Sequence, residues 1–491
     1  MLIGIDVGTT AVKAALFDLE GNAVKAISQR YPTSRPRPGH VEQDPDDWMR
    51  LVLLALAELA AAALPGSIQA IGLCSQVNTH VFVDAAGKAL LPAMTWQDGR
   101  CAEEALRLDA QISAAEKLGW WGAPLPIDAS HVLSRMAHVQ RHHPADWKET
   151  RWVLAPKDYC LAHLTGEVVT DPMTAFGVID GNLEIVPRLL SLVEASESRL
   201  PPLAPFTKII GRIRGGLPCA GVPMVTGAMD AWSGLLGAGV SKDGQGLYLS
   251  GTSEILGIVS ARKAPVAGVI AFPKYEGITL HAGPTQSGGA AIEWLSRLIG
   301  KTPLEISALA ASVETSKPLP MFLPHLEGER APLWDINSRA SLSGLSSGMG
   351  AAEVARATLE GVGYSAKLVI ESLEASACIS PVEFNHSGGG AASDIWCQIR
   401  ADILGRPVRR MKTLEAGVVG AALMAGTGIG AFRSLQAATK SFVVVDRVFE
   451  PDQAQQERHG HGFEQYKMLY RQLAPWNSAH RDHGHHVVEQ S

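Results

Sequence analysis

The sequence has 491 residues, of which 46% are hydrophobic and 19% are charged. At about 150 residues per domain, this length predicts two to three globular units, with enough apolar material for large cores and too little charge for a disordered chain. The formal net charge of −6 excludes a general attraction to nucleic acid or to anionic membranes, so neither is expected as a partner.

The N-terminal region is typical of a folded α/β protein. Residues 1–6 predict a buried strand and no signal peptide, since no basic stretch precedes an apolar core. The most apolar segment, residues 51–64, is too short to span a bilayer and contains Glu58. Asp44 and Pro45 ahead of it are typical of a helix N-terminus, so we expect a packed helix of a soluble domain.

A β-rich run, a Gly-Thr turn with hydroxyl side chains and a second β-rich run occur twice in the chain. The first copy covers residues 2–18 around Gly8-Thr9-Thr10, and the second covers residues 246–259 around Gly251-Thr252-Ser253. Each copy is typical of a β-hairpin. Because the copies are separated by about half the chain, they predict two similarly built halves that face each other across a cleft.

The remainder of each half alternates strand and helix, as in a layered α/β domain. We predict strands at residues 68–73, 80–83, 152–154, 222–225, 382–385 and 408–411, and helices at 102–108, from 231 onward, at 395–404 and at 418–425. A boundary near residue 244 gives an N-terminal domain of residues 1–244, a C-terminal domain of residues 245–474 and a flexible tail of residues 475–491. A metal site in this tail is the less favoured alternative to a solvated segment; its histidines are His480, His483, His485 and His486.

The six cysteines form no CxxC pair, so neither a zinc ribbon nor a disulfide framework is predicted. We therefore expect a reduced, cytoplasmic protein. The sequence does not decide whether the chain forms a homodimer.

The two Gly-Thr turns are candidate phosphate-binding loops. Successive backbone N–H groups and hydroxyls in a small volume suit a polyphosphate, and Gly lets the backbone approach it closely. Lys13 could add a cation, and Asp6, at the end of its strand, suits a hydrated Mg²⁺. A single turn of this kind favours an ordinary tight hairpin, whereas two copies in corresponding positions favour a nucleotide.

Two further segments are candidates on weaker grounds. Asp230 lies between an apolar strand and a helix, where a helix N-terminus keeps a carboxylate ionised as a general base requires; an N-cap aspartate explains the position equally well. Gly388-Gly389-Gly390 lets a flat ring or a ribose approach the backbone, or simply forms a tight strand-to-helix connection.

Two apparent motifs do not carry a function. Gly300-Lys301-Thr302 resembles the end of a Walker A loop, but Leu295 stands where that loop requires Gly. Residues 344–348 match the G-x-S-x-G pattern of hydrolases, but no strong hydrophobic strand precedes them, so we expect a helix-opening loop.

Taken together, an ordered series of motifs resembles the FGGY family of carbohydrate kinases, most closely its xylulokinase-like branch. The match runs nearly end to end, to about Leu473. It comprises residues 5–10, 42–48, 96–101, 156–159, 164–166, 227–230, 250–253, 322–330, 359–364, 387–390 and 415–417.

This resemblance implies two ribonuclease-H-like domains of the actin, Hsp70 and hexokinase type, with sugar mainly in the first, ATP mainly in the second, and Mg²⁺. It implies Asp230 as catalytic base and Asp6 as the carboxylate near Mg²⁺. The implied phosphate contacts are Thr9, Thr10, Lys13, Gly251, Thr252 and Ser253, the implied adenosine contacts are Gly389 and Gly390, and the implied sugar contacts are Gln76, Asn78, Trp96, Asp98 and Asp230.

Departures from the family pattern bear on which sugar is phosphorylated and not on the type of reaction. Xylulokinases carry Gln-Met-His where this chain has Gln76-Val77-Asn78, and Gly-Asp-Asn where it has Met229-Asp230-Ala231. The first family signature usually carries a Lys where this chain has Arg135 and a Trp where it has His138. Changes of this kind alter which hydroxyls a pocket can satisfy.

The function expected is therefore ATP-dependent phosphorylation of a small sugar, with D-xylulose giving the 5-phosphate. The alternatives are a kinase for ribulose, L-xylulose, fuculose, erythritol or glycerol. More remote alternatives are a sugar-independent ATPase of the actin or Hsp70 type, a serine hydrolase using Ser346, and a sugar-sensing pseudokinase.

Overall fold

The structure is a computed structural model that describes the backbone of residues 1–485 and the side chains of residues 1–479, so the tail histidines lie outside the side chains described. The chain forms two compact units. Unit 1 contains Met1–Ser241, Phe272–Gly277 and Glu415–Val444, and unit 2 contains Lys242–Ala271, Ile278–Leu414 and the chain from Val445 on. The helices of the described chain include none that is long and apolar enough to cross a membrane.

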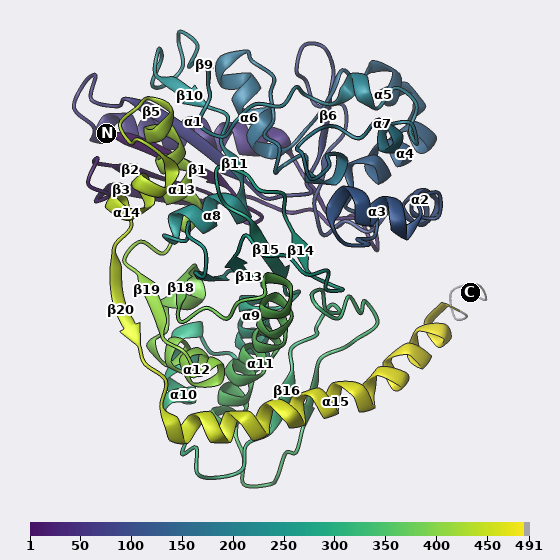
Figure 1. Ribbon diagram of the computed structural model, residues 1–491, viewed down its shortest axis with the longest axis vertical. Helices are drawn as coiled ribbons and strands as arrows, with labels where there is room; N and C mark the ends of the chain where they lie inside the picture. The colour runs from purple at the N-terminus through teal and green to yellow at the C-terminus, as the bar shows by residue number, and fades with distance from the viewer. Residues whose placement is uncertain (486–491) are drawn as a thin grey trace. The chain divides into compact units, whose positions relative to one another are not determined.

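Unit 1 is built on a seven-stranded sheet (Figure 1). Its order is β3-β2-β1-β5-β10-β9, with β11 pairing to β5. β1, β2 and β3 form an antiparallel meander, and β5 runs parallel to β1. The bounds are β1 Leu2–Val7, β2 Ala11–Phe17, β3 Ala23–Arg30, β5 Ala70–Ser75, β9 Ile209–Arg212, β10 Pro223–Val225 and β11 Ala228–Met229.

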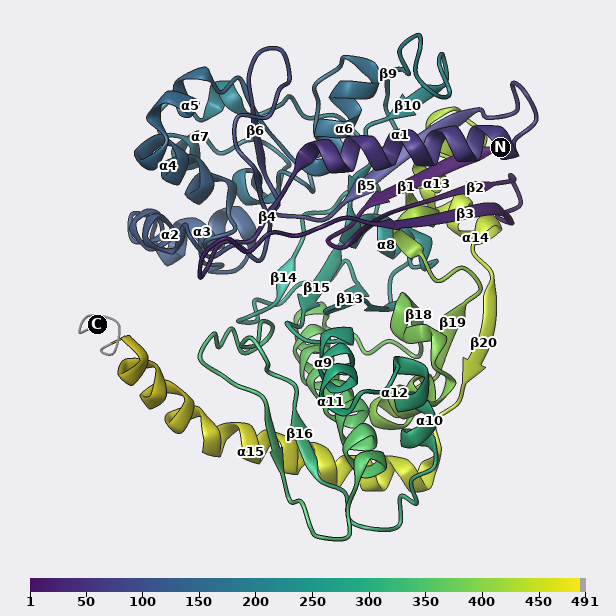
Figure 2. The ribbon, with the colours of Figure 1, turned by 180° about the vertical axis from the view of Figure 1, so that it is seen from behind.

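Alternation along β1 directs its side chains to two differently covered faces. On one face, Ile3 and Ile5 join a buried apolar core with helix α1 (Pro45–Ala62), which lies along the sheet in Figure 2. Asp44 caps α1 by accepting from the N–H of Asp46 at 3.0 Å, as the sequence predicted. On the other face, Gly4 allows helix α13 (Ala416–Gly428) to approach closely, since a Cβ at Gly4 would lie 1.9 Å from a helix carbonyl.

Small residues also join α13 to helix α8 (Asp230–Gly237). A Cβ at Gly237 or at Gly420 would lie 1.9 Å from a backbone oxygen of the other helix. Side chains larger than hydrogen at these positions would separate the helices, so the small-residue composition of the two segments is a packing requirement.

A second apolar core of unit 1 lies among the helices that follow the sheet. It includes Phe82, Leu133, Trp121 and Trp147. The elements of this part are β4 Glu42–Gln43, β6 Val81–Val83, β7 Ala93–Met94, α2 Ala102–Asp109, α3 Ala114–Trp121, α4 Val132–His142, α5 Pro144–Glu149, β8 Trp152–Leu154, α6 Pro156–Thr165 and α7 Pro187–Leu190. Helix α14 (Leu435–Phe442) completes the unit.

Unit 2 repeats the sheet plan of unit 1, with order β14-β15-β13-β12-β18-β19-β20. β15, β13 and β12 form an antiparallel meander, β18 is parallel to β12, β19 is parallel to β18, and β20 is antiparallel. The bounds are β12 Gly246–Ser250, β13 Glu254–Val259, β14 Ile270–Ala271, β15 Leu280–Pro284, β18 Phe384–Ser387, β19 Val408–Met411 and β20 Val445–Phe449. The predicted duplication of the two hairpins is confirmed and extends to the neighbouring strands, whereas β11 of unit 1 and β14 of unit 2 have no counterpart in the other sheet.

Helices cover this second sheet and form a further core around Phe322, Tyr364 and Tyr466. Their bounds are α9 Gly289–Ile299, α10 Pro303–Ala311, α11 Ala351–Ala377, α12 Asp394–Leu404 and α15 Gln453–His485. A short pair of strands, β16 Met321–Leu323 and β17 Ser341–Ser343, lies beside them.

The two motifs set aside from the sequence have structural explanations. Gly300 ends α9 in the left-handed conformation, and Thr302 caps α10 in a reciprocal capping box with Glu305. Residues 344–348 form the loop that opens α11 after the short strand β17, as expected.

Candidate active site

Two of the predicted carboxylates lie at one edge of the unit 1 sheet. Asp6 is paired in register with Cys74, and Cys74 with Ala228, across the neighbouring parallel strands β1, β5 and β11. Asp230 follows β11 and is the first residue of α8, so this helix begins one residue before the predicted start at 231. Burial raises the pKa of the Cys74 thiol well above its usual value, and the charges of Asp6 and Asp230 raise it further. Asp6 and Asp230 are therefore both close enough to Cys74 to raise the pKa of the same buried thiol.

The Asp6 side chain faces the start of α13. A Cβ at Gly417 would lie 2.9 Å from its Oδ2, so glycine is required there. Its Oδ1 is buried and has no hydrogen-bond partner among the described residues. Burial raises the pKa of Asp6 to about 6, although Lys13 opposes this shift. A buried carboxylate oxygen without a donor fits a cation such as Mg²⁺, which prefers oxygen ligands.

Lys13 lies on β2, opposite Asp6 in the hairpin register. Its ammonium pairs with Glu415 at 2.6 Å, and both side chains are partly exposed. An anion that approaches Lys13 would therefore compete with Glu415 for the same ammonium.

The first Gly-Thr turn is held by side chains from three other segments. Gln43 donates to the Thr9 carbonyl at 2.7 Å, Trp96 donates from its indole to the Thr9 hydroxyl at 3.0 Å, and Tyr31 donates to the Gly8 carbonyl. Thr10 is exposed. Trp96, predicted from the family resemblance, is thus adjacent to Thr9 in the structure.

Gln76 follows β5 and is completely buried. Its amide donates to Gln43 at 2.8 Å, whereas its Oε1 has no partner among the described residues. Its backbone N–H donates to the Val7 carbonyl at 3.1 Å, which fixes it beside the end of β1. The unsatisfied oxygen is a suitable acceptor for a ligand hydroxyl.

The other two predicted sugar contacts have different surroundings. Asn78 is exposed, has a left-handed backbone (φ 54°), and donates to Ser130 at 3.2 Å. Asp98 is buried, and its carboxylate accepts from the Val41 N–H at 2.6 Å and from Arg100 at 2.6 Å. Burial opposes ionisation, but these donors hold the pKa of Asp98 below its usual value. Its contact with sugar stays a prediction.

In unit 2, the second Gly-Thr turn and the triple-glycine segment lie at one sheet edge. β12 and β18 are parallel, with Leu249 in register with Ser387, so the loops that follow them are neighbours. Gly388 adopts φ 94°, and a Cβ there would lie 2.4 Å from the Ser250 carbonyl. Only glycine combines this conformation with this close approach. Gly389 and Gly390 then form a short 3₁₀ turn ahead of α12.

A fully buried polar network lies beneath these two loops. Glu254 accepts from Arg400 at 2.7 Å, from Tyr248 at 2.7 Å and from Ser250 at 3.1 Å. Ser250 also contacts His386 at 3.0 Å. Arg400 in turn donates to the Gly390 carbonyl at 3.3 Å. The network therefore joins the strand before one loop to the backbone of the other.

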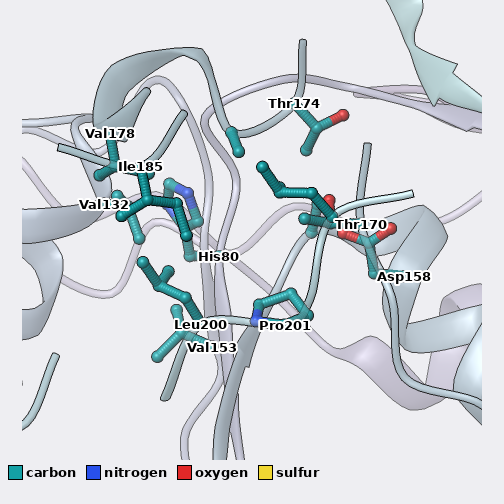
Figure 3. Close-up of a pocket in the computed structure, with 13 residues that line it drawn as sticks. His80, Val132, Val153, Asp158, Thr170, Thr174, Val178, Ile185, Leu200 and Pro201 are labelled. Atoms are coloured by element: carbon teal, nitrogen blue, oxygen red, sulfur yellow. The ribbon is translucent and has the colours of Figure 1, made fainter. Parts of the chain in front are cut away.

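Figure 3 shows a cavity of unit 1 that is lined by His80, Thr170 and Asp158 among apolar side chains. His80 Nδ1 and Thr170 Oγ1 are buried and have no partner among the described residues. The cavity measures about 40 Å³, which has room for a few waters that could satisfy these atoms. It is too small for a sugar.

The structure adds residues that the sequence reasoning did not select as functional. Gln43 bridges Thr9 and Gln76, and Glu254 organises the network of unit 2. The sequence signal for Glu254 is a carboxylate at the start of an apolar strand. Cys74 and Gly417 lie beside Asp6; Gly417 belongs to the matched segment 415–417, but nothing in that segment indicates contact with Asp6, and Cys74 belongs to no motif.

Comparison with known proteins gives a consistent picture. The N-terminal domain of the FGGY family of carbohydrate kinases matches residues 1–237, and its C-terminal domain matches residues 246–429. A xylulose kinase of Escherichia coli is 30% identical, with 97% of this chain and 99% of that protein aligned. A glycerol kinase of Aromatoleum aromaticum is also 30% identical, with 93% of this chain and 95% of that protein aligned. The crystal structure of a ligand-bound xylulose kinase from Lactobacillus acidophilus is similar, with a TM-score of 0.86, 26% identity, and coverage of 96% of this chain and 98% of that one.

Proposed function

The chain belongs to the FGGY family of carbohydrate kinases, and on that premise we propose that it transfers the γ-phosphate of ATP to the 5-hydroxyl of D-xylulose. The observation that carries this proposal is the sheet edge where Asp6 and Asp230 lie on either side of Cys74, next to a Gly-Thr turn. A carboxylate with an unsatisfied oxygen and a second, partly exposed carboxylate are the two groups that phosphoryl transfer requires of a protein.

Asp230 acts as the general base. It accepts the proton of the attacking hydroxyl while the oxygen forms a bond to the γ-phosphorus, and the bond from that phosphorus to the bridging oxygen breaks to release ADP. The side chain is partly exposed and begins α8, whose N-terminal dipole favours the ionised form. The protein contributes position and charge and forms no covalent intermediate.

The two Gly-Thr turns hold the phosphates. The turn at Thr9 and Thr10 would act from unit 1 with Lys13, and the turn at Gly251, Thr252 and Ser253 from unit 2. Gly389 and Gly390 provide a surface without side chains for adenosine. Both turns end a β-strand, and the network around Glu254 holds the second turn and the glycine segment together.

Asp6 would hold Mg²⁺ through water by its Oδ1, which fits because this oxygen is buried and lacks a donor among the described residues. When bound, Mg²⁺ neutralises charge on the phosphates. Gly417 and Cys74 keep the carboxylate in place from the opposite side.

Gln76, Asn78 and Trp96 would contact the sugar. The Oε1 of Gln76, which has no partner among the described residues, supports this proposal, since it can accept from a sugar hydroxyl. Asn78 stands where xylulokinases carry His, so the hydroxyl that it recognises decides which ketose is preferred. We also propose that the enzyme works in the cytoplasm, because all six cysteines are unpaired.

The substrate proposal is tested by measuring ADP release with D-xylulose, L-xylulose, D-ribulose, L-ribulose, L-fuculose, erythritol, glycerol and gluconate. We expect the highest kcat/KM with D-xylulose. A higher value with another acceptor would replace xylulose by that compound, and equal release without any acceptor would replace the kinase by an ATPase.

The role of Asp230 is tested by Asp230→Ala. We expect kcat to fall by about 10²- to 10⁴-fold while ATP binding stays close to that of the wild type, because only the proton acceptor is removed. Asp18→Ala, at a surface aspartate, is the control. Near-normal turnover of Asp230→Ala would exclude Asp230 as the base.

A further inference from the structure

Helices α2 and α4 of unit 1 bring together one glutamate and two histidines away from the proposed active site. Glu104 is on α2, and His138 and His142 are four residues apart on α4, so they lie on the same face of that helix. His138 Nδ1 lies 3.4 Å from one carboxylate oxygen of Glu104, and His142 Nε2 lies 3.2 Å from the other. One ligand atom from each residue lies within 4.8 Å of the others.

Two imidazoles and a carboxylate are a common ligand set for zinc. In a tetrahedral site with bonds of about 2.0–2.2 Å, neighbouring ligand atoms are about 3.3 Å apart. The separations of 3.4 and 3.2 Å, each measured to a different carboxylate oxygen of Glu104, are close to this value. Three protein ligands leave the fourth position for water, and the partly exposed His142 leaves the group open to solvent.

A metal ligand set needs a neutral imidazole and an ionised carboxylate. Burial lowers the pKa of His138, so its imidazole is neutral near pH 7. Burial opposes ionisation of Glu104, but its hydrogen bonds to the helix backbone and to His138 lower its pKa. Arg141 is a competing cation, with its guanidinium 3.6 Å from Glu104.

We propose that Glu104, His138 and His142 form a Zn²⁺ site that joins α2 to α4. His138 stands where the family signature usually carries Trp, so family members with that Trp lack this ligand. The same helix carries Arg135, which donates to the carbonyls of Thr95 and Asp98 on either side of Trp96. Zinc therefore stabilises the helix that supports the proposed sugar-binding segment.

The test is equilibrium dialysis of the full-length protein against Zn²⁺, with metal and protein measured in the same sample. We expect one Zn²⁺ per chain, and a visible spectrum typical of tetrahedral coordination when Co²⁺ is used instead. His138→Trp and His142→Ala should each lose the bound ion. His138→Trp restores the side chain that the family signature carries, and His142 is partly exposed at the end of α4, so both variants should fold.

Two control variants separate this site from other histidines and charges. A variant with alanine at positions 480, 483, 485 and 486 removes the tail histidines and should keep the Zn²⁺. Arg141→Ala removes the competing cation and should bind Zn²⁺ at least as tightly as the wild type. The proposal is wrong if the wild type retains no Zn²⁺, if His138→Trp retains it, or if the tail variant loses it, in which case binding is adventitious.

Discussion

The two Gly-Thr turns occupy equivalent places in two sheets of the same order, but the buried charges around them differ. At the first turn, Asp6 is partly exposed, but its Oδ1 is buried and has no hydrogen-bond partner among the described residues, and burial raises its pKa to about 6. At the second turn, Glu254 is completely buried and accepts from Arg400, Tyr248 and Ser250. The fold is therefore repeated, whereas the chemistry is not. Unit 1 leaves a charge available for a ligand, and unit 2 uses its buried charges to hold two loops.

The largest expected effect comes from breaking the hydrogen-bonded network around Glu254 in unit 2. Glu254→Gln leaves the Arg400 guanidinium buried without its counter-charge, which should lower the free energy of unfolding by about 3–5 kcal/mol. Denaturant unfolding measures this loss, and the KM for ATP should rise because both loops of unit 2 lose their support. Glu464→Gln, at an exposed glutamate of α15 that pairs with Lys467, is the control and should unfold like the wild type. Equal stability of the two variants would contradict the role assigned to the network.

Asp6→Asn tests the carboxylate at the first turn, whose Oδ1 has no hydrogen-bond partner among the described residues. The amide keeps the shape of the side chain but removes its charge, so kcat should fall by about 10²- to 10³-fold at saturating ATP. The free energy of unfolding should stay the same or rise, because the substitution removes a negative charge whose buried Oδ1 has no donor among the described residues. Steady-state kinetics and denaturant unfolding measure both quantities. Lower stability with unchanged kcat would assign Asp6 a structural role instead.

A buried histidine of unit 2 predicts a pH dependence. Burial lowers the pKa of His325 to about 4, while its side chain contacts Ser338 and Tyr466. In the unfolded chain, His325 takes up a proton below about pH 6.5. In the folded chain, it does so only below about pH 4. Stability should therefore fall as the pH falls from 6.5 to 4, by about 3 kcal/mol from this residue.

His325→Gln removes the titrating group, so its stability should fall less than that of the wild type over the same pH range. Urea unfolding at several pH values compares the two proteins. Parallel curves for the variant and the wild type would show that His325 does not supply this dependence.

The smallest expected effect comes from a substitution that displaces the Asp6 carboxylate. In Gly417→Ala the new Cβ would lie 2.9 Å from Asp6 Oδ2 and 3.3 Å from Cys74 Sγ, so the carboxylate must move. A displacement of this size should lower kcat by about 10- to 100-fold. Gly119→Ala is the matched control, since a Cβ at Gly119 meets no atom within 4 Å. Equal kcat values for the two variants would mean that the position of Asp6 is not critical.

Local patterns in the sequence predicted the hairpins, the α1 cap and the two small-residue helices, because each depends on residues close together in the chain. Asp6 was also selected as a candidate in this way, since a carboxylate that ends a buried strand beside a Gly-Thr turn is conspicuous, and its role stays a prediction. The predicted boundary near residue 244 stays a prediction: the chain first passes from unit 1 to unit 2 after Ser241, but Phe272–Gly277 and Glu415–Val444, which the prediction gave to the C-terminal domain, lie in unit 1.

What the sequence could not predict depends on contacts between distant segments. Gly417 touches Asp6 only because the segment Glu415–Val444 packs with unit 1, and no local pattern indicates this. Gln43 looks like part of a helix-start motif, yet it joins Thr9 to Gln76. The strand predicted at residues 382–385 begins two residues later, at Phe384, because Val382 is largely exposed and outside the sheet.

The most direct test of the account is the fate of the γ-phosphate of ATP in the wild-type enzyme. With labelled ATP and D-xylulose, we predict that the label appears in a sugar 5-phosphate in an amount equal to the ADP formed, and that little label is released when the sugar is left out. Release of the label as inorganic phosphate at the same rate with and without sugar would contradict it.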